Sequence, residues 1–301
     1  MSHHLTWFEA GVVGAMQGVA ELFPVSSLGH SVLIPAVVGG SWARDMDVSK
    51  AESPYLAFIV GLHVATALAL LVYFWRDWVR IIGGLVTSVV RREVRTSDQR
   101  LAWLLVLATI PVGVVGLVGE HWFRTTLAKP VPTAIFLIVN GLVLFGSEYL
   151  RRRDPGTDSE YVDERVSGPQ SDERLAALPV GRAVAIGATQ IAALAPGISR
   201  SGVATVAGMV RGLSREDAAR FSFLLATPVI LAAGVLKLGD LAGPLGDGIR
   251  GQVLFGSVLS GAGAYLSVRF LTRYLAQRSL RPFGAYCVAA GVAALIWFAI
   301  R

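Results

Sequence analysis

The chain has 301 residues, of which 53% are hydrophobic and only 16% are charged, and its mean hydropathy is +0.58. This composition excludes an ordinary soluble domain and indicates a membrane protein. A single cysteine, Cys287, excludes a disulfide framework and a thiolate metal site, so we expect it to serve in packing. Met1 to Phe8 lack the basic segment and cleavage site of a secretory signal, so we expect every segment to belong to the mature protein.

The first apolar region, residues 7–40, is interrupted by a polar segment that contains Pro24 and Gly29. Each flank covers only about half of a bilayer at the rise of a helix. We therefore expect a helical hairpin that enters the membrane and returns on the same side. Irregular backbone at this depth is tolerated where it is buried in protein or lines a cavity.

Three apolar runs follow at 55–75, 101–119 and 132–149, and each is long enough to cross ~30 Å of hydrocarbon. Together with the hairpin they form the first predicted repeat, residues 1–150. Residues 151–180 are dense in charged residues, Gly and Pro, and they show no apolar periodicity. We expect a mobile cytoplasmic linker there.

The predicted second repeat, residues 181–301, has the same order. An apolar region at 181–213 is interrupted by a polar segment around Arg200, and three apolar runs follow at 218–238, 252–270 and 283–300. The fold class expected is therefore an all-α polytopic membrane protein with six transmembrane helices and two re-entrant helical hairpins.

Charge placement predicts the orientation of these elements. Most of the 27 Lys and Arg residues lie in four connecting stretches, 76–100, 150–182, 211–217 and 269–282, which the positive-inside rule places in the cytoplasm. Both termini then lie outside, the first hairpin enters from outside and the second enters from the cytoplasm.

Three spans follow each hairpin, so the two halves have opposite orientations, which is an inverted-topology repeat. Such repeats place their binding site near the membrane midplane, between the halves. A gapless alignment gives a weak sequence echo of the repeat. In it Gln17, Ala20, Ser26 and Gly29 fall on Gln190, Ala193, Ser199 and Gly202.

Ionisable residues inside a membrane are costly, so each invites a functional interpretation. The apolar regions contain few, namely Glu21, His30, His63 and Arg200. His63 either lines the predicted site or forms a structural hydrogen bond. Asn140 and Gln190 give weaker signals, and the run from Arg220 to Leu225 is assigned no chemistry.

Gln17 and Glu21 stand four residues apart and therefore share one helix face. A carboxylate beside an amide oxygen suits a hard divalent cation. The alternative is that Glu21 only forms a structural ion pair with Arg200. Gly14 and Gly18 alternate with Gln17 and Glu21 along this helix and would let another backbone approach it closely.

Ser26 and Ser27 precede a new apolar helix, so we expect one of them to cap it and the other to be free to act. His30 follows Ser27 by one helical turn, and its imidazole could reach the serine or a phosphate oxygen. The alternative for His30 is a structural hydrogen-bond donor.

The second hairpin tip combines an arginine with hydroxyl groups and glycines. A guanidinium donates two parallel hydrogen bonds to phosphate, and a helix start adds backbone N–H groups. If the two tips converge, they form a polyanion site that fits a diphosphate. The phosphate-binding residues expected are Ser26, Gly197, Ser199, Arg200 and Ser201.

These motifs resemble those of the undecaprenyl-pyrophosphate phosphatase family of the BacA type, and the resemblance covers essentially the whole chain. The first family signature matches the run from Gln17 through Glu21 to Pro24-Val-Ser-Ser-Leu-Gly-His30. The second matches Pro196-Gly-Ile-Ser-Arg-Ser201. This second match is incomplete at its final position, where the family has Thr and this chain has Ala204, while Thr205 follows one place later.

The resemblance implies hydrolysis of a polyprenyl pyrophosphate to its monophosphate and inorganic phosphate, dependent on Mg²⁺ or Ca²⁺. It assigns Gln17 and Glu21 to the metal, and Glu21, Ser27, His30 and Arg200 to catalysis. Either Ser27 attacks phosphorus with His30 as acid/base, or His30 attacks directly. The role implied is recycling of the lipid carrier for cell-wall synthesis and bacitracin resistance, in the bacterial inner membrane with the site facing outward.

Two other functions compete with this one. Inverted repeats with broken helices are also typical of carriers, so a second hypothesis is that the chain flips a polyprenyl phosphate. A lipid phosphatase of the PAP2 type is excluded, because it needs a His-Asp pair downstream of its Ser-Arg motif and no histidine follows Ser199-Arg200 in this chain. The partners expected are the lipid substrate and the bilayer, without nucleic acid, and a homo-oligomer is left open.

Overall fold

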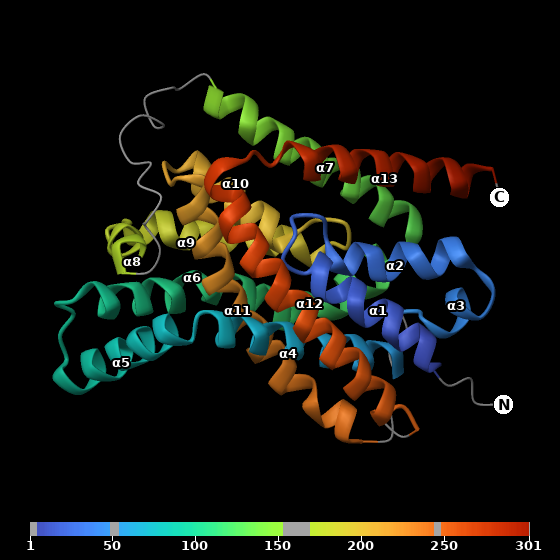
Figure 1. Cartoon of the computed structure of the whole chain (residues 1–301), viewed down its shortest axis with the longest axis horizontal. Coiled ribbons are helices and arrows are strands. Elements are labelled where there is room, and N and C mark those ends of the chain that lie inside the picture. The colour runs from blue at the N-terminus through green and yellow to red at the C-terminus, as the bar shows by residue number, and fades with distance from the viewer. Residues whose placement is uncertain (1–4, 49–53, 153–168, 244–247, 301) are drawn as a thin grey trace.

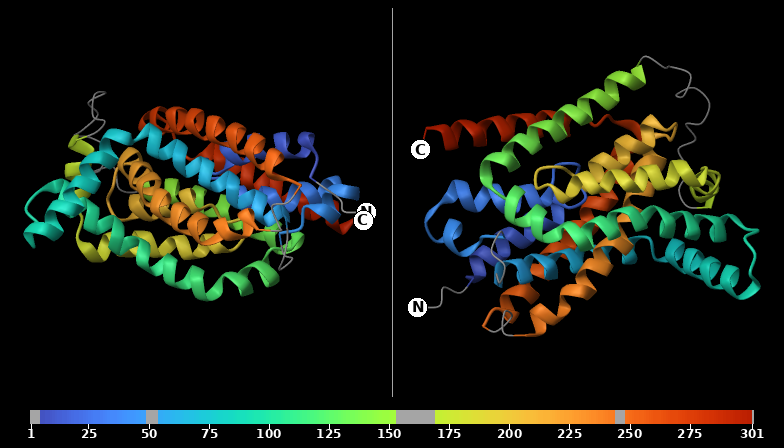
Figure 2. Two further views of the ribbon diagram at one scale, coloured as in Figure 1. Left: turned by 90° about the horizontal axis from the view of Figure 1, so that it is seen from below. Right: turned by 180° about the vertical axis from the view of Figure 1, so that it is seen from behind.

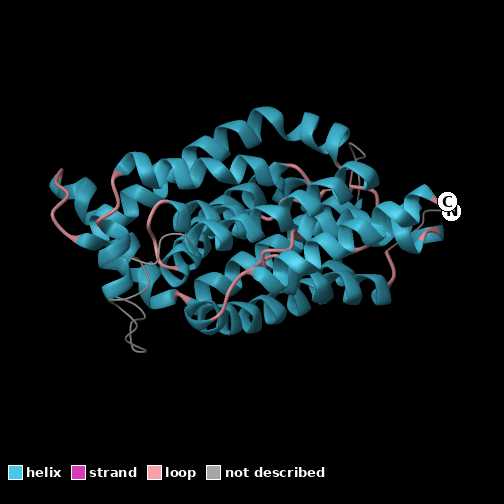
Figure 3. Ribbon diagram, turned by 90° about the horizontal axis from the view of Figure 1, so that it is seen from above, coloured by secondary structure: helices cyan, strands magenta, loops and turns pink. Residues whose placement is uncertain are grey.

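The computed structural model describes residues 5–48, 54–152, 169–243 and 248–300. Within these ranges every regular element is a helix, and Figure 3 shows the helices joined by short loops. The predicted all-helical class is confirmed.

In this described part, six helices are long and apolar enough to cross a membrane, and they coincide with the six predicted spans. Length and apolar composition alone were sufficient to locate them. They are α4 (Pro54–Tyr73), α6 (Ser97–Trp122), α7 (Pro130–Arg152), α11 (Arg215–Ala242), α12 (Arg250–Gln277) and α13 (Arg281–Ala299).

Both interrupted apolar regions consist of shorter helices that break at the polar segments. The first region forms α1 (Trp7–Ala20) and α2 (Ser27–Val38). The second forms α9 (Val180–Ala188), its 3₁₀ continuation η3 (Thr189–Leu194), and α10 (Arg200–Val210). The two breaks therefore lie where the sequence places them.

The two loops at these breaks meet inside the helix bundle, as Figure 1 shows between α12 and α7. The backbone N–H of Gly197 donates to Ser26 Oγ at 3.1 Å. Asn140 of α7 joins both loops, because its Nδ2 donates to the Pro24 carbonyl at 2.9 Å and its Oδ1 accepts from Ser199 N at 2.9 Å. The fold thus brings together two segments far apart in the sequence.

Each broken helix packs on a span from the other half of the chain. α1 lies along α12, and α9 lies along α6, as seen from behind in Figure 2. α7 lies beside α13, and α4 lies beside both α11 and α12. These pairings fix both tips relative to the six spans.

Glycines permit the closest of these approaches. A Cβ at Gly14 would lie 2.5 Å from the carbonyl oxygen of Gly256, and one at Gly18 would lie 2.3 Å from that of Ser260. The predicted close approach of another backbone to α1 is therefore seen, and that backbone belongs to α12. Any side chain larger than hydrogen would push the two helices apart.

Four short elements complete the fold. They are α3 (Gly40–Asp45), α5 (Trp75–Arg91), the π-helical turn η1 (Phe123–Leu127) and α8 (Pro169–Ala176). α5 lies against α6 within a stretch that the sequence marked only as a basic connection. Its residues Ile81, Gly84 and Ser88 are buried at helical spacing, while the opposite side is exposed.

The predicted linker covers residues 151–180, and its C-terminal part contains the helix α8. This helix is held in place because its buried polar side chains have charged partners. Ser171 Oγ donates to Asp217 at 2.5 Å, and Asp172 pairs with Arg220 at 2.9 Å. Arg80 reaches Asp172 at 2.6 Å. Arg220, assigned no chemistry from the sequence, therefore belongs to an ion-pair network between α5, α8 and α11. Residues 153–168 of the linker lie outside the described residues.

Candidate active site

The carboxylate of Glu21, which follows the last residue of α1, is buried and contacts four side chains. Its Oε2 accepts from Gln17 Nε2 at 2.9 Å and from Ser27 Oγ at 2.5 Å. His63 Nε2 lies 3.2 Å from the same oxygen. The other oxygen, Oε1, pairs with the guanidinium of Arg200. Glu21 therefore connects both hairpin tips with α4.

The two neighbouring serines have different roles in the fold. Ser26 is the cap of α2, since its Oγ accepts from Gly29 N at 3.2 Å and from Gly197 N at 3.1 Å. This residue holds a left-handed backbone, with φ of 67°. Ser27 is not needed for capping and donates its hydroxyl to Glu21. A hydroxyl on a carboxylate base is the arrangement of an activated nucleophile.

The imidazole of His30 makes contacts other than the expected one with Ser27. Its Nδ1 lies 2.7 Å from the Ser26 carbonyl oxygen, and its Nε2 lies 2.7 Å from the Tyr286 hydroxyl. The two rings are stacked, with centroids 5.7 Å apart. Because a carbonyl only accepts, Nδ1 carries the proton, and Nε2 of the neutral ring accepts from Tyr286.

The second hairpin tip presents its serines at the start of α10. Ser199 caps the helix, with its Oγ 3.2 Å from Gly202 N, and the same oxygen lies 3.1 Å from Ser201 Oγ. Ser201 also reaches the Phe23 carbonyl of the first tip at 3.4 Å. Both phosphate-binding serines predicted in this second tip are thus buried at the junction of the tips.

Gly197 is required for the second tip to fit. Its φ is +106°, and a Cβ there would lie 2.4 Å from the carbonyl oxygen of Thr133. Only glycine combines that backbone angle with that close approach. The resulting loop directs its N–H at Ser26 and begins the helix that carries Arg200.

Two buried polar atoms beside Glu21 have no hydrogen-bond partner within the described residues. They are Nη1 of Arg200, which is a donor, and Oε1 of Gln17, which is an acceptor. Buried polar groups are nearly always satisfied, and an orphan calls for an explanation. A phosphate oxygen would satisfy the first, and a cation or a water would satisfy the second.

Sequence reasoning left three residues of this cluster open or overlooked them. His63 was undecided between two roles, and it lies on Glu21. Asn140 gave a weak signal, yet it joins both tips. Tyr286 was overlooked, because a single tyrosine is common in an apolar span and its sequence context does not show what its hydroxyl contacts.

The comparisons with known proteins identify the family of this chain. The family model described as "Bacitracin resistance protein BacA" matches residues 10–293. The chain belongs to this family.

Among curated BacA relatives, one from Mycolicibacterium paratuberculosis, named undecaprenyl-diphosphatase, is 62% identical, with 100% of each chain covered. One from Frankia casuarinae, named undecaprenyl-diphosphatase 1, is 48% identical over 98% of this chain and 99% of its own. One from Burkholderia orbicola, named undecaprenyl-diphosphatase 2, is 42% identical over 98% of both chains. The similarity therefore extends over both halves and both hairpin tips of this BacA family member.

Proposed function

We propose that this chain hydrolyses undecaprenyl diphosphate to undecaprenyl monophosphate and inorganic phosphate. Relatives similar over their full length carry the name undecaprenyl-diphosphatase. The observation that carries the proposal is the Ser27 hydroxyl on the Glu21 carboxylate, beside a guanidinium with an unsatisfied donor. A carrier of anions has no need of a hydroxyl held on a base.

The arrangement supports attack by Ser27. Its Oγ bonds to the terminal phosphorus while Glu21 takes the proton. The bond between phosphorus and the bridging oxygen breaks, and undecaprenyl monophosphate leaves with the electron pair. Water then releases inorganic phosphate from the serine. Attack by His30 remains the alternative, and its Nε2 would first have to leave Tyr286.

Stabilisation of charge is the main task in phosphoryl transfer. Arg200 supplies a permanent positive charge at the start of α10, and Ser27 starts α2. The N-terminal ends of both helices attract anions through their free N–H groups and their dipoles. We propose that the diphosphate binds between them and displaces Glu21 from Arg200.

A divalent cation, Mg²⁺ or Ca²⁺, would be held by Glu21 and by the unsatisfied Oε1 of Gln17. No group of three or more His, Cys, Asp or Glu in the described ranges could hold a metal ion. This donor set fits an ion that takes its other ligands from substrate phosphates and water. When bound, the ion would neutralise phosphate charge during the reaction.

The same proposal covers the position of the enzyme in the membrane. We place the two broken helices as re-entrant hairpins of an inverted repeat in the bacterial inner membrane, with the site open to the outer side. Reciprocal packing supports the repeat. In the gapless alignment Gly14 falls on Gly187. A Cβ at Gly187 would lie 1.9 Å from the Ala108 carbonyl oxygen of α6, and a Cβ at Gly14 would likewise meet the backbone of α12.

The reaction returns the lipid carrier of cell-wall synthesis to its monophosphate form. The description of the matching family adds bacitracin resistance to this role. The undecaprenyl tail requires only apolar side chains facing lipid, so we expect weak selectivity for chain length.

One observation favours a second function, that of a polyprenyl-phosphate carrier. Helices broken at the centre of the molecule, with their ends at the site, are common in transporters. Transport requires a closed membrane, whereas hydrolysis proceeds in detergent. This difference separates the two functions.

The test is release of inorganic phosphate from undecaprenyl diphosphate by purified protein in detergent, with Mg²⁺, Ca²⁺ or EDTA. We expect metal-dependent release that falls at least ~100-fold in Arg200→Ala, because the variant loses the guanidinium. Arg200→Lys keeps the charge but loses the bidentate geometry, so it should recover only part of the rate. Absence of release by folded wild-type protein under every condition would favour the carrier.

A further inference from the structure

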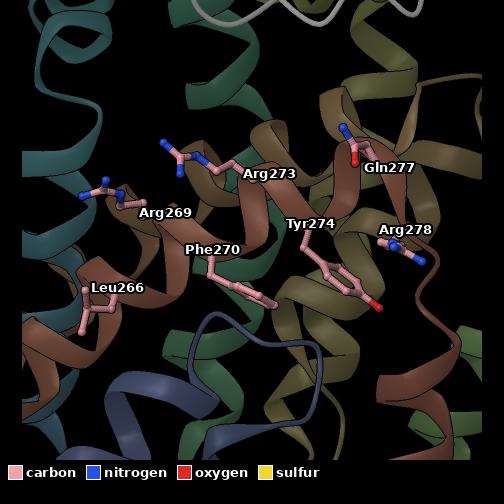
Figure 4. A pocket seen from close by; sticks show the side chains of 7 residues that line it. All are labelled: Leu266, Arg269, Phe270, Arg273, Tyr274, Gln277 and Arg278. Carbon is pink, nitrogen blue, oxygen red and sulfur yellow. The ribbon is translucent and has the colours of Figure 1, made fainter.

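An open cavity of about 440 Å³ lies along the C-terminal turns of α12, and no residue of the candidate active site lines it. Figure 4 shows Arg269 and Arg273 on one side of the helix and Phe270 and Tyr274 on the other, with Arg278 after its last turn. Leu266 completes the apolar side. Basic and apolar side chains therefore line the same cavity.

The three arginines of this cavity are exposed. Throughout the described residues, their guanidinium groups make no hydrogen bond or ion pair, in contrast to Arg80, Arg174, Arg215 and Arg220 at the same end of the molecule. The helix dipole does not account for Arg269 and Arg273, because its effect is confined to the last turn, which contains neither of them. Arg278 is the C-cap residue of this helix. Three guanidinium groups are thus available for an external anion.

The apolar side of the cavity faces outward. Leu266 is 65% exposed and Phe270 is 50% exposed. They stand in a helix that is apolar enough to cross a membrane, just before its basic end. Arginine side chains extend from such a position to the headgroup region while their stems stay along apolar surface. Acyl chains beside Leu266 and a phosphate beside the arginines would satisfy both sides.

We propose that this cavity binds the headgroup phosphate of an anionic phospholipid from the membrane leaflet at the basic end of the molecule. Basic side chains at the cytoplasmic end of a membrane helix attract such headgroups. The three arginines would compensate the phosphate charge, and Gln277 would add an amide donor. The inference does not depend on the proposed enzymatic reaction.

The cavity is also connected to the first hairpin tip. Phe270 stacks on Phe23, with ring centroids 5.8 Å apart and an angle of 9° between the planes. Phe23 and Tyr274 both pack edge-on against Phe283, each at 5.4 Å. Phe23 lies two residues after Glu21, so a lipid that orders this aromatic group would also steady the loop carrying the carboxylate.

The experiment is native mass spectrometry of the full chain released from bilayers of phosphatidylcholine with and without phosphatidylglycerol. The variant is Arg269→Gln with Arg273→Gln and Arg278→Gln. A matched control, Arg91→Gln with Arg92→Gln and Arg182→Gln, removes the same charge from exposed positions outside the cavity. We expect retained phosphatidylglycerol to fall at least ~10-fold in the cavity variant and to stay unchanged in the control.

Equal retention in the two triple variants would overturn the proposal, because lipid binding would then follow overall charge. Retention of added undecaprenyl monophosphate in preference to phosphatidylglycerol would also overturn it and would make the cavity a site for the polyprenyl lipid. If the triple variant does not fold, Arg273→Gln with Arg182→Gln as its control decides the same question. None of these outcomes bears on the proposed hydrolysis, which the phosphate release assay tests separately.

Discussion

Ser27 and Glu21 form the contact on which the chemistry depends. The hydroxyl lies 2.5 Å from the carboxylate, while the adjacent Ser26 is occupied in capping. The residue pattern indicated that the two serines would divide these roles without showing which one was the cap, and the family resemblance assigned catalysis to Ser27. The partner of the free serine also differs from the expected His30, because the Ser26 carbonyl and Tyr286 occupy both imidazole nitrogens.

Ser27→Ala is expected to reduce phosphate release by at least ~100-fold, since it removes the attacking oxygen. Ser31→Ala is the matched control, because Ser31 is buried in the same helix and, among the residues that the structure describes, its hydroxyl bonds only to the Ser27 carbonyl. The assay is the steady-state rate of phosphate release in detergent. Both variants should first be shown to have the melting temperature of the wild-type protein. Retained activity in Ser27→Ala, with loss in His30→Ala, would transfer the attack to His30.

The individual residues of the motifs were predictable from the sequence, but the side chains that contact them were not. Glu21, Ser27 and Arg200 stand out because polar and charged groups are rare in apolar segments. Tyr286 and His30 are 256 positions apart, and no local pattern brings them together. His63 looked the same as a structural histidine until the position of α4 was known.

Close backbone contacts between helices are the main feature at the scale of elements. Gly14 and Gly18 of α1 meet the backbone of α12, and Gly187 of α9 meets that of α6. Each contact fixes the helix that leads to a hairpin tip. The positions of Glu21 and Arg200 therefore depend on glycines that make no contact with substrate.

Gly18→Ala is expected to lower the melting temperature in detergent, because its Cβ would lie 2.3 Å from the Ser260 carbonyl oxygen. Overpacking of this kind costs about 1–3 kcal/mol or more. Gly113→Ala in α6 is the control, since no atom lies within 4 Å of its added Cβ. We expect the control to match or slightly exceed wild type. Equal melting temperatures for Gly18→Ala and the control would contradict the close packing.

The six spans and the two broken helices were predictable from hydropathy, whereas α5 and α8 were not. Each of the six spans is a continuous apolar run, which leaves few alternatives in a membrane. α5 was overlooked because its arginines suggested a loop, although Ile81, Gly84 and Ser88 lie on one buried face. α8 was overlooked because its helix is stabilised by Asp217 and Arg220, which lie more than forty positions away.

For the whole molecule, charge distribution gives an orientation that remains a prediction. The basic connections, including the end of α12 with its cavity, are assigned to the cytoplasm by the positive-inside rule. The site at the junction of the tips is assigned to the outer side.

Two threonines provide a direct test of orientation. Thr96 and Thr126 are both exposed and lie beyond opposite ends of α6. In intact cells, a membrane-impermeant maleimide should label Thr126→Cys and should label Thr96→Cys only after permeabilisation. Cys287 is buried and should not react, so the wild-type chain is the blank. The reverse pattern of labelling would contradict the assigned orientation and with it the outward-facing site.

The most direct test of the central claim is phosphate release from undecaprenyl diphosphate by Glu21→Gln in detergent, measured beside Glu9→Gln. Both residues are buried glutamates of the first hairpin, and Glu9 caps the start of α1 far from Ser27. The account predicts that Glu21→Gln loses at least ~100-fold in rate, because the amide accepts no proton from Ser27, while Glu9→Gln stays near wild type. Wild-type release by folded Glu21→Gln would contradict the assignment of this carboxylate to the reaction.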